Sequence, residues 1–508
     1  MAGKLNGATG SFSSPKGTGA SRKGIDSRKG SVSSHSAGLK KVKKLNSLPI
    51  SREINPKQQS EETCIANGGT EDAMYTPRTL SVLIVLLAVF LFMVRYCHYL
   101  DMDVVSSVKL GLAASGVSFI AFGATHLPDS MLLRPHPSFW RAVLAVGVLY
   151  LALLSFLLFQ SLDTIRAILL LHDPSLKSLP EERQYAEDCR IFTSDDPFLF
   201  VRTTFDIFIV AHTLGYFAKT IIVRDWRAST CISVVFEIVE VTFQHALPNF
   251  KECWWDHLLL DVLICNGGGT LLGILALRIF HARRYNWVLS DNVKSKCGKA
   301  RRFISQLVPQ SLVPYEWNVF LSPKRFVQFL LLLSLMTLQE LNTFTVKHIL
   351  HIPPKHHLVV LRLVMWLFLA IPAVCEYYFY ISGLDPTNKL GPSVWVSVVN
   401  LLFEVVLAGK LAVEGNYFQE PMPGYIAIPW ITSLISLCIW FAIFFGVLTL
   451  KQRMEKRCLL YAISSVFFYF GCGCVLAMFA MGMPDLQIGR EAFQRYVYPY
   501  ERYIIFWR

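Results

Sequence analysis

The chain has 508 residues, of which 53% are hydrophobic and only 17% charged, and its mean hydropathy is +0.42. Soluble domains carry about 25% charged residues, so this composition excludes an ordinary soluble protein. Apolar runs long enough to cross a bilayer, about 20 residues each, recur from residue 79 nearly to the C-terminus. The pattern predicts an all-α, polytopic integral membrane helical bundle.

Residues 1–78 differ from the rest because they are rich in Ser, Gly and Lys and lack apolar periodicity. They hold 13 Lys+Arg against 6 Asp+Glu, a net +7 of the chain's formal +13. No apolar segment follows Met1, so we expect no cleavable signal peptide. The composition predicts a disordered basic cytosolic tail, either solvated or in contact with anionic lipid headgroups. Nucleic-acid binding is not expected, because the tail lacks interleaved aromatic residues.

The apolar runs predict ten or eleven transmembrane helices. They lie at 79–98, 104–125, 139–160, 203–223, 228–247, 257–280, 325–346, 357–382, 394–412, 425–449 and 457–483. Residues 161–171 either prolong the third span or lie along the membrane interface.

Basic residues collect in alternate links between these spans. The link at 278–302 holds eight Lys+Arg and one acid, whereas the opposite-side stretch 173–196 holds seven acids and three bases. The positive-inside rule therefore places the N-terminus and the basic links in the cytosol. With eleven spans, the C-terminus would lie on the opposite side.

The twelve cysteines show no CxxC…CxxC spacing, so a zinc site is not predicted from them. Cys189 and Cys253 both fall in non-cytosolic links. They would form a disulfide in an oxidising compartment, and free buried thiols are the alternative.

The fifth span contains two carboxylates in an otherwise apolar stretch, VVFEIVEVTFQ at 234–244. Glu237, Glu240 and Gln244 follow i, i+3, i+7 spacing and share one helix face. Each carboxylate costs about 2.5–3.5 kcal/mol on membrane-insertion scales. The pair therefore predicts a functional site.

The neighbouring spans and the following loop add further polar groups. They are His212, Tyr216 and Lys219 on one face of the fourth span, with Asp206, Asn249, Glu252, Asp256, Asp261 and Asn266 nearby in the chain. Crowded carboxylates cannot all stay ionised without a cation, and oxygen ligands of this kind suit Ca²⁺ or Mg²⁺. His212, taken as the only His well inside the group, is the predicted general base. The triplet at 267–269 is expected to loosen the sixth span, so that backbone carbonyls can face a ligand.

Two further segments supply candidate residues. Glu340 and Asn342, in LQELNTF of the seventh span, either line the same cavity or make structural hydrogen bonds. RPHPSFWR at 134–141 contains three candidate regulatory residues, Arg134, His136 and Arg141. Its two arginines could hold a phosphate, and an interfacial turn is the alternative.

The stretch FEIVEVTFQHALPNFKECWWDHLLLDVLICNGGG, residues 236–269, resembles the core signature of the animal phosphatidylserine synthases. AHTLGYFAKTIIVRDW, RPHPSFWR and ELNTF show the same resemblance, which runs from about residue 79 to about residue 450. IVRDW, PPKHHLVVLRLV at 353–364 and KLGPSVW at 389–395 are more similar to the second animal isozyme than to the first. The basic tail and the apolar run 457–483 have no obvious counterpart in the family.

The resemblance implies a Ca²⁺-dependent base-exchange enzyme of the endoplasmic reticulum membrane. Such an enzyme replaces the headgroup of phosphatidylethanolamine, or of phosphatidylcholine, with L-serine and needs neither ATP nor a CDP-activated donor. The chain would then consist of a disordered tail at 1–78, a catalytic domain at 79–456, and an extra span with a tail at 457–508.

The residues that the family needs match eight positions, namely His212, Glu237, Glu240, Asn249, Glu252, Asp256, Asp261 and Asn266. The roles expected are catalysis by His212, Glu252 and Asp256, Ca²⁺ binding by Glu237, Glu240, Asp261 and Asn266, and substrate binding by Asn249, Tyr216, Lys219, Glu340 and Asn342. Glu252 and Asp256 would bind the ammonium of serine or ethanolamine. Direct transfer and a covalent phosphatidyl-His212 intermediate both stay open.

Charge patterning predicts a site that opens to the lumenal side, with phospholipid and L-serine as its partners. The oligomeric state is open, with a homodimer as one alternative. A secondary transporter is a rival interpretation, but it should show an internal repeat, and we see none. A membrane-bound acyltransferase is another rival, and it would not need six nearby acids.

Overall fold

The computed structural model of the chain describes residues 79–100, 104–132, 135–177, 189, 207–281, 314–384, 389–449 and 454–482. All of them belong to one unit of the chain, Pro56–Arg508. Every regular element within these ranges is a helix, which confirms the predicted all-α class. The interpretation of 1–78 as a disordered tail lies outside the described residues.

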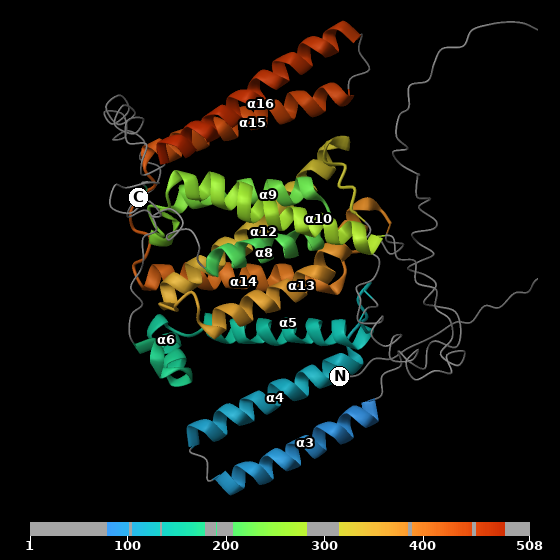
Figure 1. Cartoon of the computed structure of the whole chain (residues 1–508), viewed down its shortest axis with the longest axis vertical. Helices are drawn as coiled ribbons and strands as arrows, with labels where there is room; N and C mark the ends of the chain where they lie inside the picture. Colours follow the sequence, from blue (N-terminus) through green and yellow to red (C-terminus); the bar gives the residue numbers. More distant parts are fainter. Residues whose placement is uncertain are drawn as a thin grey trace, which may run out of the picture. The chain divides into compact units, whose positions relative to one another are not determined.

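Each of the eleven predicted spans corresponds to an observed helical segment (Figure 1). They are α3 (Thr79–Leu100), α4 (Val104–His126), α5 (Pro137–Leu158), α8 (Ile207–Val223), α9 (Trp226–Phe243), η4 (Asp256–Asn266) continuing into α10 (Gly267–His281), α12 (Pro323–Leu350), α13 (His357–Ser382), α14 (Pro392–Glu414), α15 (Gly424–Thr449) and α16 (Met454–Gly482). Among the described residues, eight of these are long and apolar enough to cross a membrane by length and composition. The chain is therefore a polytopic helical membrane protein.

Shorter elements connect the spans. They are α6 (Leu162–His172), η2 (Pro174–Lys177), η3 (Pro248–Phe250) and η6 (Val319–Leu321). Helix α6 does not prolong the third span, because α5 ends at Leu158 and a new N-cap follows. The Ser161 hydroxyl accepts a hydrogen bond from the Thr164 amide at 3.2 Å, and this satisfies one of the free N–H groups of the first turn.

Large apolar side chains cover the outer faces of the helices. Leu263 and Leu271 are 66% and 67% exposed, for example, and Val413 is 78% exposed. Exposing such a surface to water would cost free energy, whereas lipid tails, which are as apolar as leucine side chains, solvate it well. The exposed apolar surface thus agrees with a membrane-embedded bundle.

Hydrogen bonds between helix ends show which ends lie on the same side of the bundle. The Trp317 indole before α12 donates to the Val223 carbonyl at the end of α8, at 3.2 Å. At the other ends, Arg166 of α6 donates to the Ile349 carbonyl at the end of α12, at 3.0 Å. Lys410, near the end of α14, donates to the Gln160 carbonyl after α5. Helices α5, α12 and α14 therefore end on one side of the bundle and α8 ends on the other, as alternating spans require.

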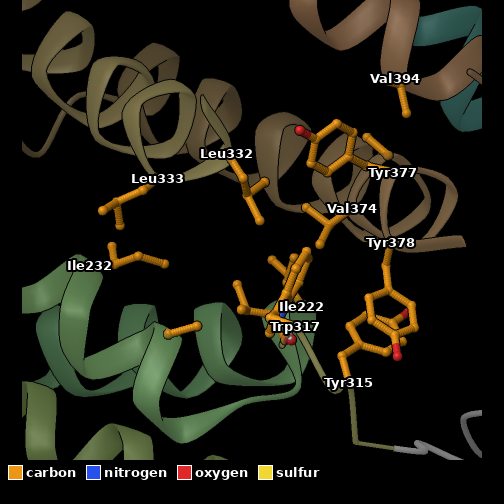
Figure 2. Close-up of a cluster of buried hydrophobic side chains, with 13 residues drawn as sticks. Ile222, Ile232, Tyr315, Trp317, Leu332, Leu333, Val374, Tyr377, Tyr378 and Val394 are labelled. Atoms are coloured by element: carbon orange, nitrogen blue, oxygen red, sulfur yellow. Dashed lines mark hydrogen bonds between the residues drawn. The ribbon is translucent and has the colours of Figure 1, made fainter. Parts of the chain in front are cut away.

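An apolar cluster joins α8 and α9 to α12, α13 and α14. Ile222 and Ile232 face Leu332, Leu333 and Val374 across the gap between these helices (Figure 2). The rings of Tyr315 and Tyr378 stack with centroids 4.0 Å apart. This cluster fixes α8 and α9, the two helices that carry the first candidate site residues.

Two glycines allow α10 to lie directly on α8. A Cβ on Gly269 would collide with the Thr213 carbonyl of α8, and one on Gly273 would lie 2.6 Å from the Thr220 Cβ. Small residues four apart allow close helix packing in membranes. The expectation that the triplet at 267–269 loosens the span is therefore wrong: the glycines lie in regular α-helix, and the irregular winding precedes them in η4.

We expect Gly269→Ala to destabilise the protein by about 1–3 kcal/mol, the usual cost of overpacking. The clash is with a backbone oxygen, which cannot rotate away. Gly268→Ala is the matched control, because its Cβ would meet no atom within 4 Å and Ala favours a helix. Thermal unfolding in detergent should show a lower midpoint for Gly269→Ala only. Equal midpoints would mean that α8 and α10 do not pack this closely.

Candidate functional site

Helix α9 presents a row of buried polar side chains toward η4. Ser233, Glu237 and Glu240 are 2%, 4% and 5% exposed. Their i, i+4, i+7 spacing puts them on one helix face. The predicted pairing of Glu237 with Glu240 on a single buried face is thus present in the structure.

Segment η4 faces this row and is wound as a π-helix over Asp256–Asn266. His257, Asp261 and Asn266 are all buried on it, at 1%, 7% and 1% exposure. In an α-helix with 3.6 residues per turn, the nine residues from His257 to Asn266 would place the two side chains on opposite faces. The wider π turn, with i→i+5 hydrogen bonds, brings all three to the face that meets α9.

Three carboxylates converge on one nitrogen of His257. The Nδ1 atom lies 2.9 Å from Glu237 Oε2, 3.4 Å from Glu240 Oε2 and 3.8 Å from Glu252 Oε2. One N–H can donate to one or two of these oxygens. Accordingly, Glu252 Oε2 is buried and has no hydrogen-bond partner among the described residues.

His212 of α8 pairs with the fourth acid of the group. Its Nδ1 lies 2.9 Å from Asp261 Oδ1, and its side chain is 37% exposed, whereas that of His257 is 2% exposed. An Asp partner on one ring nitrogen leaves the other nitrogen able to accept a proton. His212 therefore has both an orienting partner and an open side.

Asn266 links the two faces. Its amide nitrogen donates to Ser233 Oγ at 3.0 Å and approaches Glu237 Oε1 at 3.5 Å. Its Oδ1 is buried without a hydrogen-bond partner among the described residues. A second buried oxygen is thus left without a donor in the same group.

The loop before η4 is held by a covalent bond and carries Glu252. Cys189 and Cys253 form a disulfide, which confirms the pairing that the sequence left open. The Trp255 indole donates to the Cys189 carbonyl at 3.1 Å. Burial raises the pKa of the Glu252 carboxyl well above its usual range, and the Glu240 carboxylate raises it further.

The last span also contacts this group. The Phe479 ring of α16 lies edge-on to His257, with centroids 5.8 Å apart. Gln244, at the end of α9, donates to the Gly482 carbonyl at 2.7 Å. Helix α16, which the sequence treated as an appendage, therefore covers part of the site.

Lys219 lies further along the His212 face of α8. Its Nζ donates to both Glu340 oxygens, at 2.8 and 2.7 Å, and lies 3.9 Å from the centroid of the Tyr216 ring. The structure thus brings three predicted substrate-binding residues together as a half-buried ion pair above an aromatic ring.

The structure does not place Asn342 with them. Its amide nitrogen donates to Glu404 Oε2 at 2.9 Å, in a separate buried network. Arg362 donates to both oxygens of Glu404, at 3.0 and 2.5 Å, and Trp366 donates at 3.2 Å. Of the two interpretations of Asn342, structural hydrogen bonding is the one observed.

The remaining predicted residues are scattered. Asn249 lies in η3, and Asp256 is half-buried at the start of η4. His136 caps α5, accepting from the Ser138 amide at 3.1 Å. Arg141 is 5% exposed and bonds Asp129 at 2.6 Å, so its guanidinium is already paired. Arg134 and Asp206 lie outside the described residues.

His257 is the main residue that the sequence interpretation missed. The view that His212 is the only His well inside the group is wrong, because His257 lies at its centre. A signal was present, since His257 and Asp261 are four residues apart. The WWDH segment at 254–257, which ends at His257, was interpreted as part of a loop. Helical spacing was therefore not applied to His257 and Asp261.

The donor set fits a divalent cation. One ligand atom from each of Glu237, Glu240 and His257 lies within 4.8 Å of the others. Three acids compensated by one imidazole leave negative charge in a buried place, and the unpartnered Glu252 and Asn266 oxygens are hard ligands of the kind that Ca²⁺ prefers. Asp261, predicted as a further ligand, is instead paired with His212.

The chain is a polytopic helical membrane protein whose site combines a partly open His–Asp pair with a buried carboxylate cluster. These are elements of an intramembrane transferase site. The family model described as "Phosphatidyl serine synthase" matches residues 135–412. The chain belongs to this phosphatidylserine synthase family. It is thus a multi-pass membrane enzyme of phosphatidylserine synthesis, and the transporter and acyltransferase interpretations lose their support.

Curated relatives from plants and animals resemble most of the chain. CDP-diacylglycerol–serine O-phosphatidyltransferase 2 of Oryza sativa subsp. japonica is 36% identical over 391 residues, which is 74% of this chain and 91% of the relative. Phosphatidylserine synthase 2 of Homo sapiens is 34% identical over 404 residues, 78% of this chain and 82% of the relative. Phosphatidylserine synthase of Drosophila melanogaster is 33% identical over 393 residues, 76% of each chain.

We expect the Cys189–Cys253 bond to stabilise the loop that carries Glu252. The bond closes a loop of 64 residues, for which the chain-entropy model gives about 4 kcal/mol. The double variant Cys189→Ser/Cys253→Ser should unfold at lower temperature and lose activity. Cys438→Ser, at an exposed free cysteine, is the control. Alkylation in denaturant without reduction, read by mass spectrometry, should label Cys438 and spare the pair; labelling of all three would contradict the bond.

Proposed function

We propose that the enzyme makes phosphatidylserine by base exchange, replacing the ethanolamine headgroup of phosphatidylethanolamine with L-serine. The observation that carries this proposal is the division of labour in the site. His212 is held by Asp261 and is partly open, while Glu237, Glu240 and Glu252 lie together with more negative charge than His257 can balance. Phosphodiester transfer to an alcohol needs both a base and compensation of phosphate charge.

His212 takes the role of general base in this proposal. With its Nδ1 turned to Asp261, its Nε2 accepts the proton from the serine hydroxyl. The serine oxygen then forms a bond to phosphorus, and the bond from phosphorus to the headgroup oxygen breaks. The imidazolium returns the proton to the leaving alkoxide, so atoms and charge balance without ATP. His257 is a poor candidate for this role, because its ring is enclosed by carboxylates and is 2% exposed.

The carboxylate cluster takes the role of a Ca²⁺ site. Glu237, Glu240 and Glu252 would hold the ion, with Asn266 Oδ1 as a neutral ligand. When bound, Ca²⁺ supplies positive charge against the phosphate oxygens. His257 keeps the cluster together by donating to Glu237, and half-buried Asp256 would attract the ammonium of serine or ethanolamine.

The endoplasmic reticulum membrane is the proposed location, with the site open to the lumen. The Cys189–Cys253 disulfide supports this side, because such bonds persist in oxidising compartments. The basic links on the opposite side support a cytosolic N-terminus. Lumenal Ca²⁺ would then reach the cluster directly.

A second candidate concerns the lipid donor. The names of the Oryza sativa and Arabidopsis thaliana relatives specify CDP-diacylglycerol, whereas those of the animal relatives specify phosphatidylserine synthase only. A CDP-diacylglycerol donor would use the same attack of serine on phosphorus, with CMP as the leaving group. The His212–Asp261 pair serves either donor, so the assay must include both.

We expect labelled L-serine to enter phosphatidylserine when the purified protein receives phosphatidylethanolamine and Ca²⁺. Matched vesicles with phosphatidylcholine or CDP-diacylglycerol are the comparison arms. Release of ethanolamine in equal amount identifies base exchange, whereas release of CMP identifies the second candidate. Absence of labelled product with all three donors would overturn the proposed function.

We expect two variants to separate the metal from the base. Glu240→Gln should raise the Ca²⁺ concentration for half-maximal activity at least about tenfold, equivalent to 1.4 kcal/mol, because it removes a charged ligand of the same shape. His212→Ala should lower kcat by about 10²–10⁴-fold, as loss of a general base does, and leave that Ca²⁺ concentration unchanged. A His212→Ala enzyme with near-normal kcat would remove His212 from the mechanism.

A further inference from the structure

A second cluster of metal-ligating side chains lies where α6 meets the start of α13. His172 is the last residue of α6 and Asp173 follows it. His356 caps α13 and His357 is its first residue. None of these residues belongs to the candidate active site, and neither the proposed function nor the relatives' names use them.

The donor atoms of the cluster are close to one another. His172 Nε2 lies 3.2 Å from His357 Nε2, and His356 Nε2 lies 3.0 Å from Asp173 Oδ2. One ligand atom from each of Asp173, His356 and His357 lies within 4.8 Å of the other two. His357 therefore lies beside both His172 and the Asp173–His356 pair, although these residues come from segments more than 180 residues apart in the chain.

His356 serves to orient the carboxylate. Its Nδ1 accepts a hydrogen bond from the Leu358 amide at 3.2 Å, so its proton resides on Nε2, which donates to Asp173. Asp173 Oδ1 in turn accepts from the Ser175 amide at 2.9 Å. The carboxylate is therefore fixed from both sides while lone pairs on its oxygens remain. A histidine that positions a ligating carboxylate resembles the outer-shell groups of known metal sites.

We propose that His172, His357 and Asp173 bind a divalent transition metal of the Zn²⁺ class, with His356 as the positioning residue. Zn–N bonds of about 2.0–2.1 Å in a tetrahedral site separate two ligand nitrogens by about 3.3 Å, which the His172–His357 distance of 3.2 Å matches. Imidazole favours Zn²⁺ over Ca²⁺. Two His and one carboxylate also leave a fourth position for water.

The same geometry explains why the metal can enter. His172 and His357 are exposed, while His356 and Asp173 are partly buried. Without metal, the two Nε2 atoms share one proton in a hydrogen bond, and the metal replaces that proton. Binding would join the end of α6 to the start of α13. Helix α6 also has apolar contacts and hydrogen bonds to other elements. Arg166 donates to Ile349 and Tyr417, the Leu162 amide donates to Glu414, and Lys109 donates to the His172 carbonyl.

The test is Zn²⁺ binding to the full-length, tag-free protein in detergent, with Ca²⁺ saturating so that the acidic cluster is occupied. Isothermal titration should show one Zn²⁺ site, and X-ray absorption should show nitrogen and oxygen ligands with two imidazoles. His172→Ala/His357→Ala should lose that site, together with the rise in unfolding temperature that Zn²⁺ causes in the wild type. His126→Ala, at the exposed end of α4, is the matched control and should keep both.

Two further variants keep the result interpretable. Asp173→Asn, which preserves the side-chain shape, should weaken Zn²⁺ binding, and His356→Gln should weaken it by about 10–100-fold, as loss of an outer-shell partner does. Unchanged unfolding temperature in EDTA would show that all variants fold. Zn²⁺ binding of the double variant equal to that of the wild type, or no Zn²⁺ site in the wild type, would overturn the proposal. Failure of the proposed serine-incorporation assay would not affect this test, because Zn²⁺ binding is measured directly.

Discussion

The site depends on one electrostatic constraint, which is that three carboxylates share a single imidazole nitrogen inside a bundle surrounded by lipid. His257 Nδ1 lies within 3.8 Å of Glu237, Glu240 and Glu252. Buried charge is expensive unless it is paired, and one N–H cannot pair three acids. The excess charge is relieved by protonation of the acids or by a bound cation, and this is the basis on which Ca²⁺ is proposed.

The surrounding structure can be understood as support for that arrangement. The π-wound η4 turns His257, Asp261 and Asn266 to one face, where an α-helix would separate them. Gly269 lets α10 lie on α8, which brings His212 to Asp261. The disulfide at Cys253 anchors the loop that delivers Glu252. Together these features bring α8, α9 and η4 to one place.

Much of the fold could be predicted from sequence, because hydropathy alone sets where a chain can cross a bilayer. The pairing of Glu237 with Glu240 followed from helical spacing, and the disulfide was among the alternatives. The positions that escaped prediction depend on winding and on long-range pairing. His257 was missed because its helix begins with irregular π winding. The partner of Asn342 was missed because Glu404 lies 62 residues away in the chain. The imidazole pair of His172 and His357 was hidden by a separation of 185 residues, and cysteine spacing could not indicate a metal site made of His and Asp.

Buried carboxylates elsewhere in the bundle show what distinguishes the site. Glu404 receives hydrogen bonds from Arg362, Asn342 and Trp366, and Glu376 receives them from the Ser393 amide and hydroxyl and the Val394 amide at the start of α14. Both are satisfied by the protein itself and therefore stabilise it. Glu252 has a buried oxygen with no such donor among the described residues. The buried acids of this family member thus fall into two groups. Those that receive hydrogen bonds from protein donors have a structural role, and those without such donors are available to a ligand.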